Sequence, residues 1–488
     1  MNNLISDMDM TKSRRVVMLT PDCHPIDRRI VAKAKTLQNR GFEVIVLATK
    51  RRPDEPLGLT YEDVKIHFIS PVRSVWNKVS NAFFQCVIRS TDKLLLLPYL
   101  VSNNIKSALF GVHAKVARDA SWRKILKSYH PVLLILLVSN KLLLKVAGLF
   151  CRPKNIVLAR LQHFVERLCW YFEGINPEEK AFFEEAMLLR PDIIEANDLP
   201  TLRPAIEVKR KLKIPLVYDM HEIYFSIDTI SPIRRFELRR RERRLLKEVD
   251  LAITVNPLAA QMISKLHKCP PPFVVQNAVG RNIISAGQSK PNLFREEFPS
   301  IGSRTILLYQ GWITSVSSRN LVALIKAIHL VADECVLVMM GYGENAFFED
   351  LIRSERLENA VFIKPAVSQS ELLKYTASAD IGIIPYSASA DLNTSMASPN
   401  KLYEFIQAHL PILSNDLAFV RSIVEVEGFG EVIDFSDKDL FSKTCRKMRG
   451  QLSNYLSALE EKSQIYSWET EEKKYLEPLN RILHSPIA

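Results

Sequence analysis

The segment SPNKLYEF, residues 398–405, places several polar residues at the start of a predicted helix, after an apolar strand and a small polar loop. Ser398 is a suitable N-cap and Pro399 a suitable first helical residue. The free N–H groups and the positive dipole end of such a helix start can bind phosphate. Lys401 and Glu404 lie three positions apart and share one face of the helix. A lysine for a diphosphate and a carboxylate for ribose hydroxyls together suit a nucleotide sugar.

The same residues also fit a well-capped surface helix. Asn400 and Lys401 both lie within one turn of Glu404, and a Lys–Glu pair there would contribute only about 0.2–0.5 kcal/mol. The apolar positions are expected to face the core in either case: Leu402, Phe405 and Ile406. Taken alone, the segment favours this simpler interpretation, so the elements around it must decide.

Short apolar runs typical of strands alternate with helical patterns along most of the chain. The first series comprises residues 16–20, 42–49, 192–197, 214–220, 251–255 and 273–277. The second comprises residues 304–311, 335–341, 360–365, 381–386, 410–415 and 430–435. This spacing predicts β-α-β units with parallel sheets, and hence an α/β fold with two Rossmann-like domains in tandem. Ligands bind beyond the carboxyl ends of such strands, so we expect the two domains to face a cleft.

The domain boundaries follow from the same alternation. We expect an N-terminal domain over residues 1–285, a linker near 285–300 and a C-terminal domain over 300–460. Residues 461–488 carry no further strand pattern. The segment SWETEEKKYLEPLNRIL, residues 467–483, is amphipathic and is therefore expected to be a closing helix packed on the domains.

Residues 75–180 interrupt the alternation with a leucine-rich, helix-like sequence. Residues 131–151 approach the roughly 20 apolar residues that a spanning helix needs. Asn140, Lys141 and Lys145 lie inside that stretch, and each charge near a bilayer centre costs about 2.5–3.5 kcal/mol. The sequence leaves three interpretations: a buried helical insertion, which we favour, a surface that enters the lipid headgroup layer, and a spanning helix.

The net charge of +12 is distributed unevenly along the 488 residues. From Pro291 onward there are 19 Lys and Arg against 26 Asp and Glu, so the first 290 residues carry 47 against 28. The segment 234–250 alone holds eight basic residues. This asymmetry favours an anionic partner near the first domain, such as a membrane surface or a phosphorylated acceptor. Plain solubility, and a solvated helix face at 234–250, are the alternatives.

Several common functions find little support in the sequence. The seven cysteines form no C-x-x-C pair, which argues against a disulfide framework and favours a reducing compartment. The segment GYGENA, 341–346, matches G-x-G-x-x-A, but the strand after it ends in lysine and proline rather than in the acidic residue that NAD binding requires. The glycines Gly341 and Gly343 more plausibly allow a tight turn and close backbone approach to a ligand. No D-x-D-like metal pair stands out, and no aromatic-interleaved basic patch indicates nucleic-acid binding.

Five segments, taken in order, resemble a GT-B glycosyltransferase, and more narrowly the retaining family 4 type. They are HPIDRRIVAKAKTLQNRGFEVIVLA, PDIIEANDLPTL, PLVYDMHEIY, the donor signature ADIGIIPY…SPNKLYEFIQAHLPILSND, and YSWETEEKKYLEPL. The resemblance covers about 1–72 and 181–483. It implies a GT-B fold, with the leucine-rich segment as an insertion in the N-terminal domain. It also implies transfer of a sugar from a nucleotide-sugar donor, such as a UDP- or GDP-sugar, with retention and without a cofactor or metal.

The resemblance also assigns roles to individual positions. Glu404 would hold the donor ribose, Arg319 and Lys401 would contact the diphosphate, and His221 would lie close to the reacting sugar. The other donor-side residues would be Gly311, Gly341, Gly343, Pro365, Val367, Ser398, Pro399, Asn400 and Leu402. Asp27, Arg28, Asp198 and Glu222 would face the cleft from the acceptor domain. Without the resemblance, a lone histidine such as His221 would more often be structural.

Two departures from the family pattern keep a second function open. Met396 stands where many members have a second glutamate, and Gly311 is followed by Trp312 rather than by arginine. Arg319 is the residue that could replace the missing arginine. If it does not, a non-catalytic relative that acts as a binding or scaffold subunit becomes the alternative.

The sequence also suggests a location and an acceptor. The first fifteen residues lack the long apolar core of a secretory signal, so we expect a cytoplasmic protein, peripheral on the inner face of the plasma membrane if the basic surface binds lipid. A glycan or lipid-linked acceptor, such as a polysaccharide precursor, fits the basic, leucine-rich first domain.

Overall fold

The structure, a computed structural model, describes residues 13–23, 26–50, 57–69, 177–227, 230, 232–281 and 290–484. The predicted insertion at 75–180 lies outside these ranges, apart from its last four residues. Among the described helices, none is long and apolar enough to cross a membrane.

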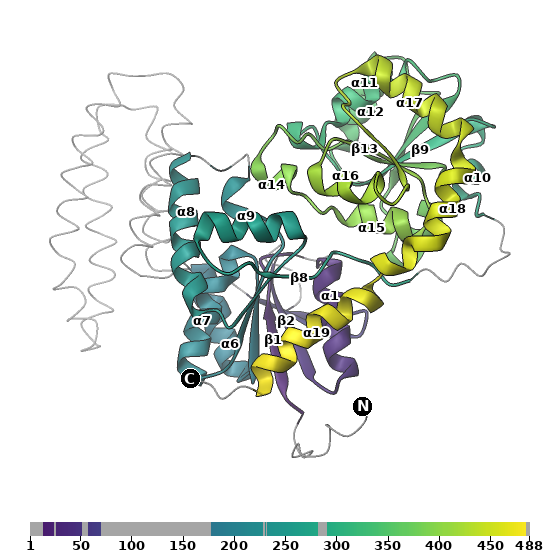
Figure 1. The fold of residues 1–488 in the computed structure, drawn as a ribbon. Helices are drawn as coiled ribbons and strands as arrows, with labels where there is room; N and C mark the ends of the chain where they lie inside the picture. Colours follow the sequence, from purple (N-terminus) through teal and green to yellow (C-terminus); the bar gives the residue numbers. More distant parts are fainter. Residues whose placement is uncertain are drawn as a thin grey trace, which may run out of the picture. The chain divides into compact units, whose positions relative to one another are not determined.

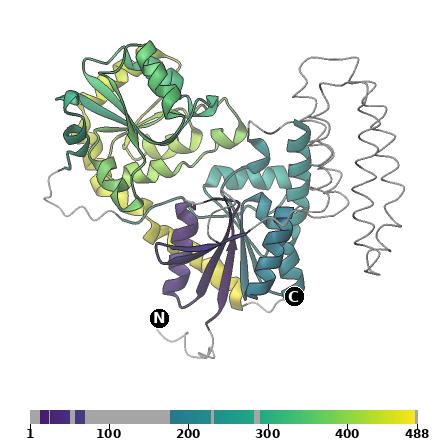
Figure 2. The same ribbon diagram turned by 180° about the vertical axis from the view of Figure 1, so that it is seen from behind.

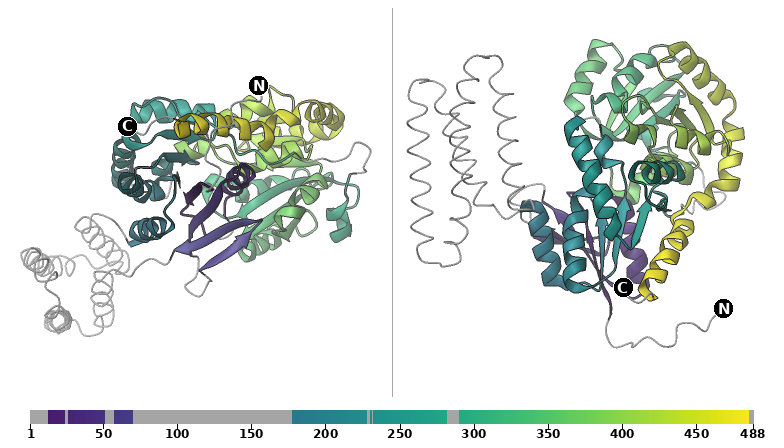
Figure 3. Two further views of the ribbon diagram at one scale, coloured as in Figure 1. Left: turned by 90° about the horizontal axis from the view of Figure 1, so that it is seen from below. Right: turned by 60° about the vertical axis from the view of Figure 1, so that its left-hand side comes forward.

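The first sheet has eight strands in the order β3-β4-β2-β1-β5-β6-β7-β8 (Figure 1). Their bounds are β1 Arg15–Leu19, β2 Glu43–Thr49, β3 Gly58–Tyr61, β4 Val64–Ile69, β5 Ile193–Asn197, β6 Leu216–Met220, β7 Leu251–Thr254 and β8 Phe273–Val274. All neighbours pair in parallel except β3 and β4. The antiparallel β3–β4 pair, whose purple and indigo strands are in view in Figures 2 and 3, is absent from the predicted strand series.

The helices of this half follow the β-α-β order. Their bounds are α1 Arg28–Asn39, α6 Pro177–Leu189, α7 Leu199–Leu212, α8 Pro232–Leu245 and α9 Pro257–His267, with a short 3₁₀ turn η1 at Tyr224–Ser226. Only eight residues separate the end of β1 from the start of α1, so the first turn of α1 lies at the carboxyl edge of the sheet. That edge is where the acceptor-side residues were predicted.

The second sheet has six strands in the order β11-β10-β9-β12-β13-β14, all parallel. Their bounds are β9 Thr305–Ile313, β10 Cys335–Gly343, β11 Val361–Pro365, β12 Ile381–Ile384, β13 Ile412–Asn415 and β14 Gly430–Ile433. The helices are α10 Leu293–Glu297, α11 Leu321–Ile328, α12 Asn345–Ser354, α13 Gln369–Ala377, α14 Leu392–Ser395, α15 Asn400–Gln407, α16 Ala418–Val424, α17 Lys438–Gly450 and α18 Leu452–Lys462, with the 3₁₀ turn η4 at Ser317–Arg319. Two parallel α/β sheets in tandem confirm the predicted fold class.

The last helix, α19 Trp468–His484, returns to the first half of the chain (Figures 1 and 3). Trp468, Tyr475 and Leu479 are buried in the same hydrophobic cluster as Val16 of β1 and Ile30 of α1. Trp468 Nε1 also donates a hydrogen bond to Thr36 Oγ1 of α1 at 3.0 Å. This helix lies in the segment predicted to close the fold, and its apolar stripe packs on the N-terminal half.

Candidate functional site

Loops at the carboxyl edge of the first sheet bring the predicted acceptor-side residues together. Asp27 caps α1 by accepting a hydrogen bond from Arg29 N at 2.8 Å, which fixes Arg28 in the first turn. Asp198 directly follows β5, and His221 directly follows the adjacent β6. The backbone N–H of His221 donates to Asp198 Oδ1 at 3.1 Å.

His221 is held as a cation by its neighbours. Its Nε2 lies 3.2 Å from Asp219 Oδ2, a buried carboxylate. Burial alone would lower the pKa of His221, but the carboxylates of Asp219 and Asp198 outweigh it and raise the pKa to about 9. Burial raises the pKa of Asp198 to about 7, against the opposing charge of His221. At neutral pH the imidazolium can therefore donate hydrogen bonds but cannot act as a base.

A buried network of charged residues surrounds Asp219, the carboxylate that His221 contacts. Lys33, fully buried on α1, donates to Asn197 Oδ1 at 2.8 Å and pairs with Asp219 at 2.6 Å and with Glu195. These three partners of Lys33 join α1 to β5 and β6, and a hydrogen bond from Tyr475 to Glu195 at 2.8 Å extends the network to α19. A buried lysine is tolerated only with such compensation. Nothing in the sequence around Lys33 indicates this network.

Arg29 completes this network. It is buried, donates to Asp219 at 2.7 Å and reaches Asn277 Oδ1 at 3.0 Å. Together with Lys33 it keeps Asp219 ionised: burial alone would raise the pKa of Asp219, but both cations hold it well below its usual range.

The glycines of the second sheet serve strand pairing. Gly311, Gly341 and Pro365 are neighbours in register across β9, β10 and β11. A Cβ on Gly341 would collide with the carbonyl of Gly311, and one on Gly343, whose φ is +143°, with the carbonyl of Ile313. The predicted tight turn after 341 is therefore wrong: both strands continue pairing to Ile313 and Gly343, and the close backbone approach is to the neighbouring strand.

Two of the residues predicted on the donor side, Pro365 and Val367, lie at or just after the end of β11. Pro365, the last residue of that strand, is exposed, and Val367 is partly buried against the core. Both stand at the carboxyl edge of the sheet, beside the end of β10.

Two cations of the donor half lie on aromatic rings. Lys401 Nζ is 3.8 Å from the ring centre of Tyr309 and 4.7 Å from that of Tyr386. Arg319 Cζ is 4.2 Å from the ring centre of Tyr386. Lys401 is buried, its Nζ makes no hydrogen bond of ordinary geometry among the described residues, and it lies 3.6 Å from the Cβ position of Gly311. Burial lowers the pKa of Lys401, and the charge of Arg319 acts in the same direction.

Glu404 is buried on the same helix as Lys401. Its carboxylate accepts a hydrogen bond from Gln310 Nε2 and pairs with Arg28. Thr376 donates to Gln310 Oε1 at 2.9 Å, which fixes the amide. Because Lys401 and Glu404 are 5% and 6% exposed, the surface-helix interpretation of this segment is wrong.

The start of α15 differs in detail from the prediction. The helix begins at Asn400, Pro399 holds the cap position and makes no side-chain cap, and Ser398 Oγ lies 2.9 Å from Tyr403 OH. Ser398 as N-cap is therefore wrong. Leu402 is fully buried in the core, as predicted from its apolar character, so only its backbone can line a ligand site.

Residues that the sequence did not single out join the two halves. Asn393 Oδ1 accepts from Ile223 N at 2.8 Å, next to the exposed Glu222. Asn256 Nδ2 donates to Met396 O at 2.8 Å, and Asn277 Nδ2 donates to Ser398 O at 2.9 Å. Asn400 Nδ2 lies 3.4 Å from Asp27 Oδ2. Asn400 belongs to the predicted donor segment, but no motif marks Asn256, Asn277 or Asn393, because each partner lies more than a hundred residues away along the chain.

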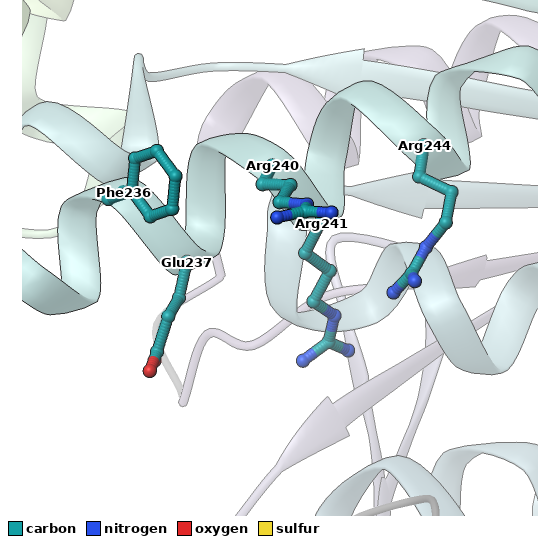
Figure 4. A pocket seen from close by; sticks show the side chains of 5 residues that line it. All are labelled: Phe236, Glu237, Arg240, Arg241 and Arg244. Carbon is teal, nitrogen blue, oxygen red and sulfur yellow. The ribbon is translucent and has the colours of Figure 1, made fainter.

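The basic segment forms α8 and its end. Arg239, Arg240, Arg243 and Arg244 are exposed, and Phe236 is 66% exposed. One pocket is lined by Phe236, Glu237, Arg240, Arg241 and Arg244, shown in Figure 4. A second pocket adds Arg203, Glu207 and Arg210 of α7, together with Leu245 and Glu248.

No cluster of three or more His, Cys, Asp or Glu side chains suited to a metal ion occurs within the described ranges. The polar groups of the two sheet edges are instead engaged with each other, with the backbone and with aromatic rings.

Comparison with known proteins gives one family match and many structural ones. The family model of Glycosyl transferases group 1 matches residues 304–449, which span β9 to α17. No curated protein sequence matches the chain.

Three solved structures illustrate the likeness of fold. Sucrose-phosphate synthase from Thermosynechococcus elongatus matches with a TM-score of 0.63 at 10% identity, covering 96% of this chain and 99% of that one. HepE from Anabaena, solved in complex with UDP-glucose, matches with a TM-score of 0.60 at 12% identity, covering 96% and 100%. The E. coli trehalose-6-phosphate protein, bound with UDP-2-fluoro glucose, matches with a TM-score of 0.57 at 11% identity, covering 97% and 99%. Such identities establish a common fold and no more. The chain thus has the GT-B fold, and residues 304–449 match the family model of group 1 glycosyl transferases.

Proposed function

We propose that the protein transfers a sugar from a nucleotide-sugar donor, such as a UDP- or GDP-sugar, to a glycan or lipid-linked acceptor with retention of configuration. The observation that carries the proposal is the buried ammonium of Lys401, which is stacked on Tyr309 and lies beside the guanidinium of Arg319 on a shared ring. A buried cation without a carboxylate of its own favours an anionic ligand. A diphosphate supplies that charge.

The two cations would act on the leaving group. As the bond from the sugar to the diphosphate breaks, negative charge grows on the diphosphate oxygen. Lys401, Arg319 and the N–H groups at the start of α15 are positioned in advance and would stabilise that charge more than the ground state. Neither a metal nor a cofactor is required in this scheme.

Glu404 and His221 would orient the donor. The carboxyl oxygens of Glu404 would accept hydrogen bonds from the two ribose hydroxyls. His221, as an imidazolium at neutral pH, would donate a hydrogen bond to a sugar oxygen and counter the negative charge around it. Backbone groups near Pro365 and Val367 would contact the base.

The acceptor would approach from the first half of the chain. Asp27, Asp198 and Glu222 surround the sheet edge there, and they suit a hydroxyl-rich ligand. The exposed arginines of α8, with Phe236 among them, suit an anionic lipid surface or a lipid-linked acceptor on it (Figure 4). The protein should bind phosphatidylglycerol vesicles and not phosphatidylcholine vesicles. The double variant Arg240→Glu/Arg244→Glu should lose this binding.

A non-catalytic relative remains the second candidate because Met396 and Trp312 depart from the family pattern. Met396 contributes its carbonyl to the contact with Asn256, and Trp312 is 46% exposed. Neither feature removes a cation from the donor side, which favours the transferase.

A screen of nucleotide sugars for thermal stabilisation tests the function. A donor at 100 times its dissociation constant should add about 2.7 kcal/mol of stability. Lys401→Met should remove that stabilisation, whereas Lys326→Met, on the solvent side of α11, should keep it. Turnover of the stabilising donor separates the transferase from a binding subunit, and the anomeric configuration of the product, read by NMR, tests retention. A panel that stabilises neither wild type nor the control would overturn the proposal.

A further inference from the structure

Tyr386 lies between the two cations of the donor half. Its ring centre is 4.2 Å from Arg319 Cζ and 4.7 Å from Lys401 Nζ. Tyr309 then covers Lys401 from another side at 3.8 Å. In the sequence Tyr386 is only the last residue of an apolar run, 381–386.

Two hydrogen bonds fix the backbone of Tyr386 and of the residue that follows it. Asn415 Nδ2, at the end of β13, donates to the carbonyl of Tyr386 at 3.0 Å. The next residue, Ser387, donates its N–H to Ser318 O at 3.0 Å. Because Ser318 belongs to η4, this bond fixes the turn that holds Arg319 beside the ring.

The cations act on the ring in return. Burial alone would raise the pKa of Tyr386, but the charges of Lys401 and Arg319 outweigh it and lower the pKa below its ordinary value. Among the described residues Lys401 forms no ion pair, and the faces of Tyr309 and Tyr386 offset part of the cost of its burial. Lys401 and Arg319 repel each other, and the negative face of a ring that both contact offsets part of that repulsion.

We infer that Tyr386 is a positioning residue, whose ring holds Lys401 and Arg319 at the separation that a single nucleoside diphosphate can bridge. The inference rests on the proposed function, since it assigns the ligand as the diphosphate of the donor. Tyr386 touches the two cations and acts through them. The role is assigned to its ring face, and Tyr386→Phe separates that role from the contact of its hydroxyl with Lys401.

A fluorination series tests the ring face without changing its outline. Tyr386→Phe is followed by replacement of residue 386 with mono-, di- and trifluorophenylalanine, and calorimetry measures the affinity for UDP and GDP. Each fluorine weakens the negative face of the ring, so affinity should fall stepwise, by roughly tenfold over the series. The same analogues at Phe441, a fully buried ring that packs on Phe435, should leave the affinity unchanged.

Two further measurements exclude a purely structural role. Tyr386→Leu should raise the KM for the donor more than it lowers kcat, and Tyr386→Phe should recover most of the affinity. If the wild type binds UDP or GDP but the affinity does not change across the fluorinated variants, the inference is overturned and the proposed function stays intact. A wild type that binds neither nucleotide would overturn the proposed function, and the inference with it. Because the fluorinated rings preserve shape, the outcome does not depend on whether the leucine variant folds.

Discussion

Arg28, in the first turn of α1, forms an ion pair with Glu404 of α15, and this pair links the two halves of the chain. The side chains are 20% and 8% exposed, so the pair is largely removed from water. The sequence analysis placed Arg28 on the acceptor side and Glu404 on the donor side. In the structure the two predicted sets meet, and the carboxylate expected to hold a ribose is shared by Arg28 and Gln310.

The Arg28–Glu404 pair should be measurable as an energetic coupling. Arg28→Met leaves the carboxylate with only Gln310, and Glu404→Gln leaves the guanidinium unpaired, so each single change should destabilise the fold. The double variant should be less destabilised than the sum, with a coupling of about 1–3 kcal/mol. Urea denaturation of the four proteins gives this number. A coupling near zero would mean that the pair is exchanged for water in solution. The exposed pair of Arg210 with Glu207 is a matched control, expected to couple by about 0.5 kcal/mol or less.

Glu404→Gln should weaken the binding of nucleoside diphosphates more than it weakens folding. The amide keeps the shape but loses the charge that strengthens hydrogen bonds from ribose hydroxyls, so affinity should fall by about tenfold to a hundredfold. Calorimetry with UDP and GDP measures the change. Glu334→Gln is the control, because Glu334 precedes β10 at the opposite end of the sheet and pairs with Arg446. Equal affinities of wild type and Glu404→Gln would remove Glu404 from the donor site.

The sequence predicted the strands well and the long-range contacts poorly. Apolar runs and helical periods are local signals, so twelve of the fourteen strands within the described ranges could be predicted, with ends shifted by a few residues, and so could the last helix. The β3–β4 pair was missed because its alternating, partly exposed residues form no continuous apolar run. Lys33 looked like any solvated helix lysine, since its partners Glu195 and Asp219 lie more than 160 residues away.

The donor-side residues were predictable to a different extent. Lys401 and Glu404 were singled out because a polar helix start after a parallel strand is a local pattern. The aromatic rings beside Lys401 were not, because Tyr309 lies in β9, Tyr386 follows the end of β12, and neither carries a motif. Gly341 was predicted to allow a tight turn, whereas in the structure a side chain at this position would collide with the neighbouring strand.

Lys33→Met should be among the most destabilising substitutions in the N-terminal half. It would leave Glu195 and Asp219 buried with one cation fewer, which costs about 3–5 kcal/mol. Lys35→Met, two positions along α1 and in an exposed pair with Glu62, should change stability by about 0.5 kcal/mol or less. Urea midpoints of both variants test the contrast. Similar midpoints would show that the buried network contributes little to the folded state.

Asp198→Asn should stabilise the protein more at pH 8 than at pH 5. The folded-state pKa of about 7 lies above the ordinary value of 3.8, so the folded state binds more protons than the unfolded one between these values. The stability contributed by wild-type Asp198 therefore falls as pH rises from about 4 to 7, and asparagine avoids that loss. Melting temperatures across this range measure the effect. A constant difference would contradict the assigned pKa.

The same variant should change the titration of His221. Asp198 is one of two carboxylates that raise the pKa of His221 to about 9, so its neutralisation should lower that pKa while Asp219 keeps it above 6.5. NMR of labelled histidine follows the change. His409, whose pKa burial lowers on the other half of the chain, serves as the internal control and should not move.

Gly341→Ala should disrupt the donor half although the added group is one methyl. Gly341 and Gly311 are partners in the β9–β10 ladder, and the new Cβ would occupy the position of the Gly311 carbonyl. Since both strands are central to the six-stranded sheet, the backbone cannot move aside without losing pairs, at a cost of about 3 kcal/mol. Gly450→Ala, at the end of α17 with no atom within 4 Å of the new methyl, should be neutral or slightly stabilising. If Gly341→Ala melts with wild type, strand spacing at this edge is looser than the ladder implies. If instead it is destabilised but still binds UDP or GDP, the glycine serves strand pairing alone and not close approach to a ligand.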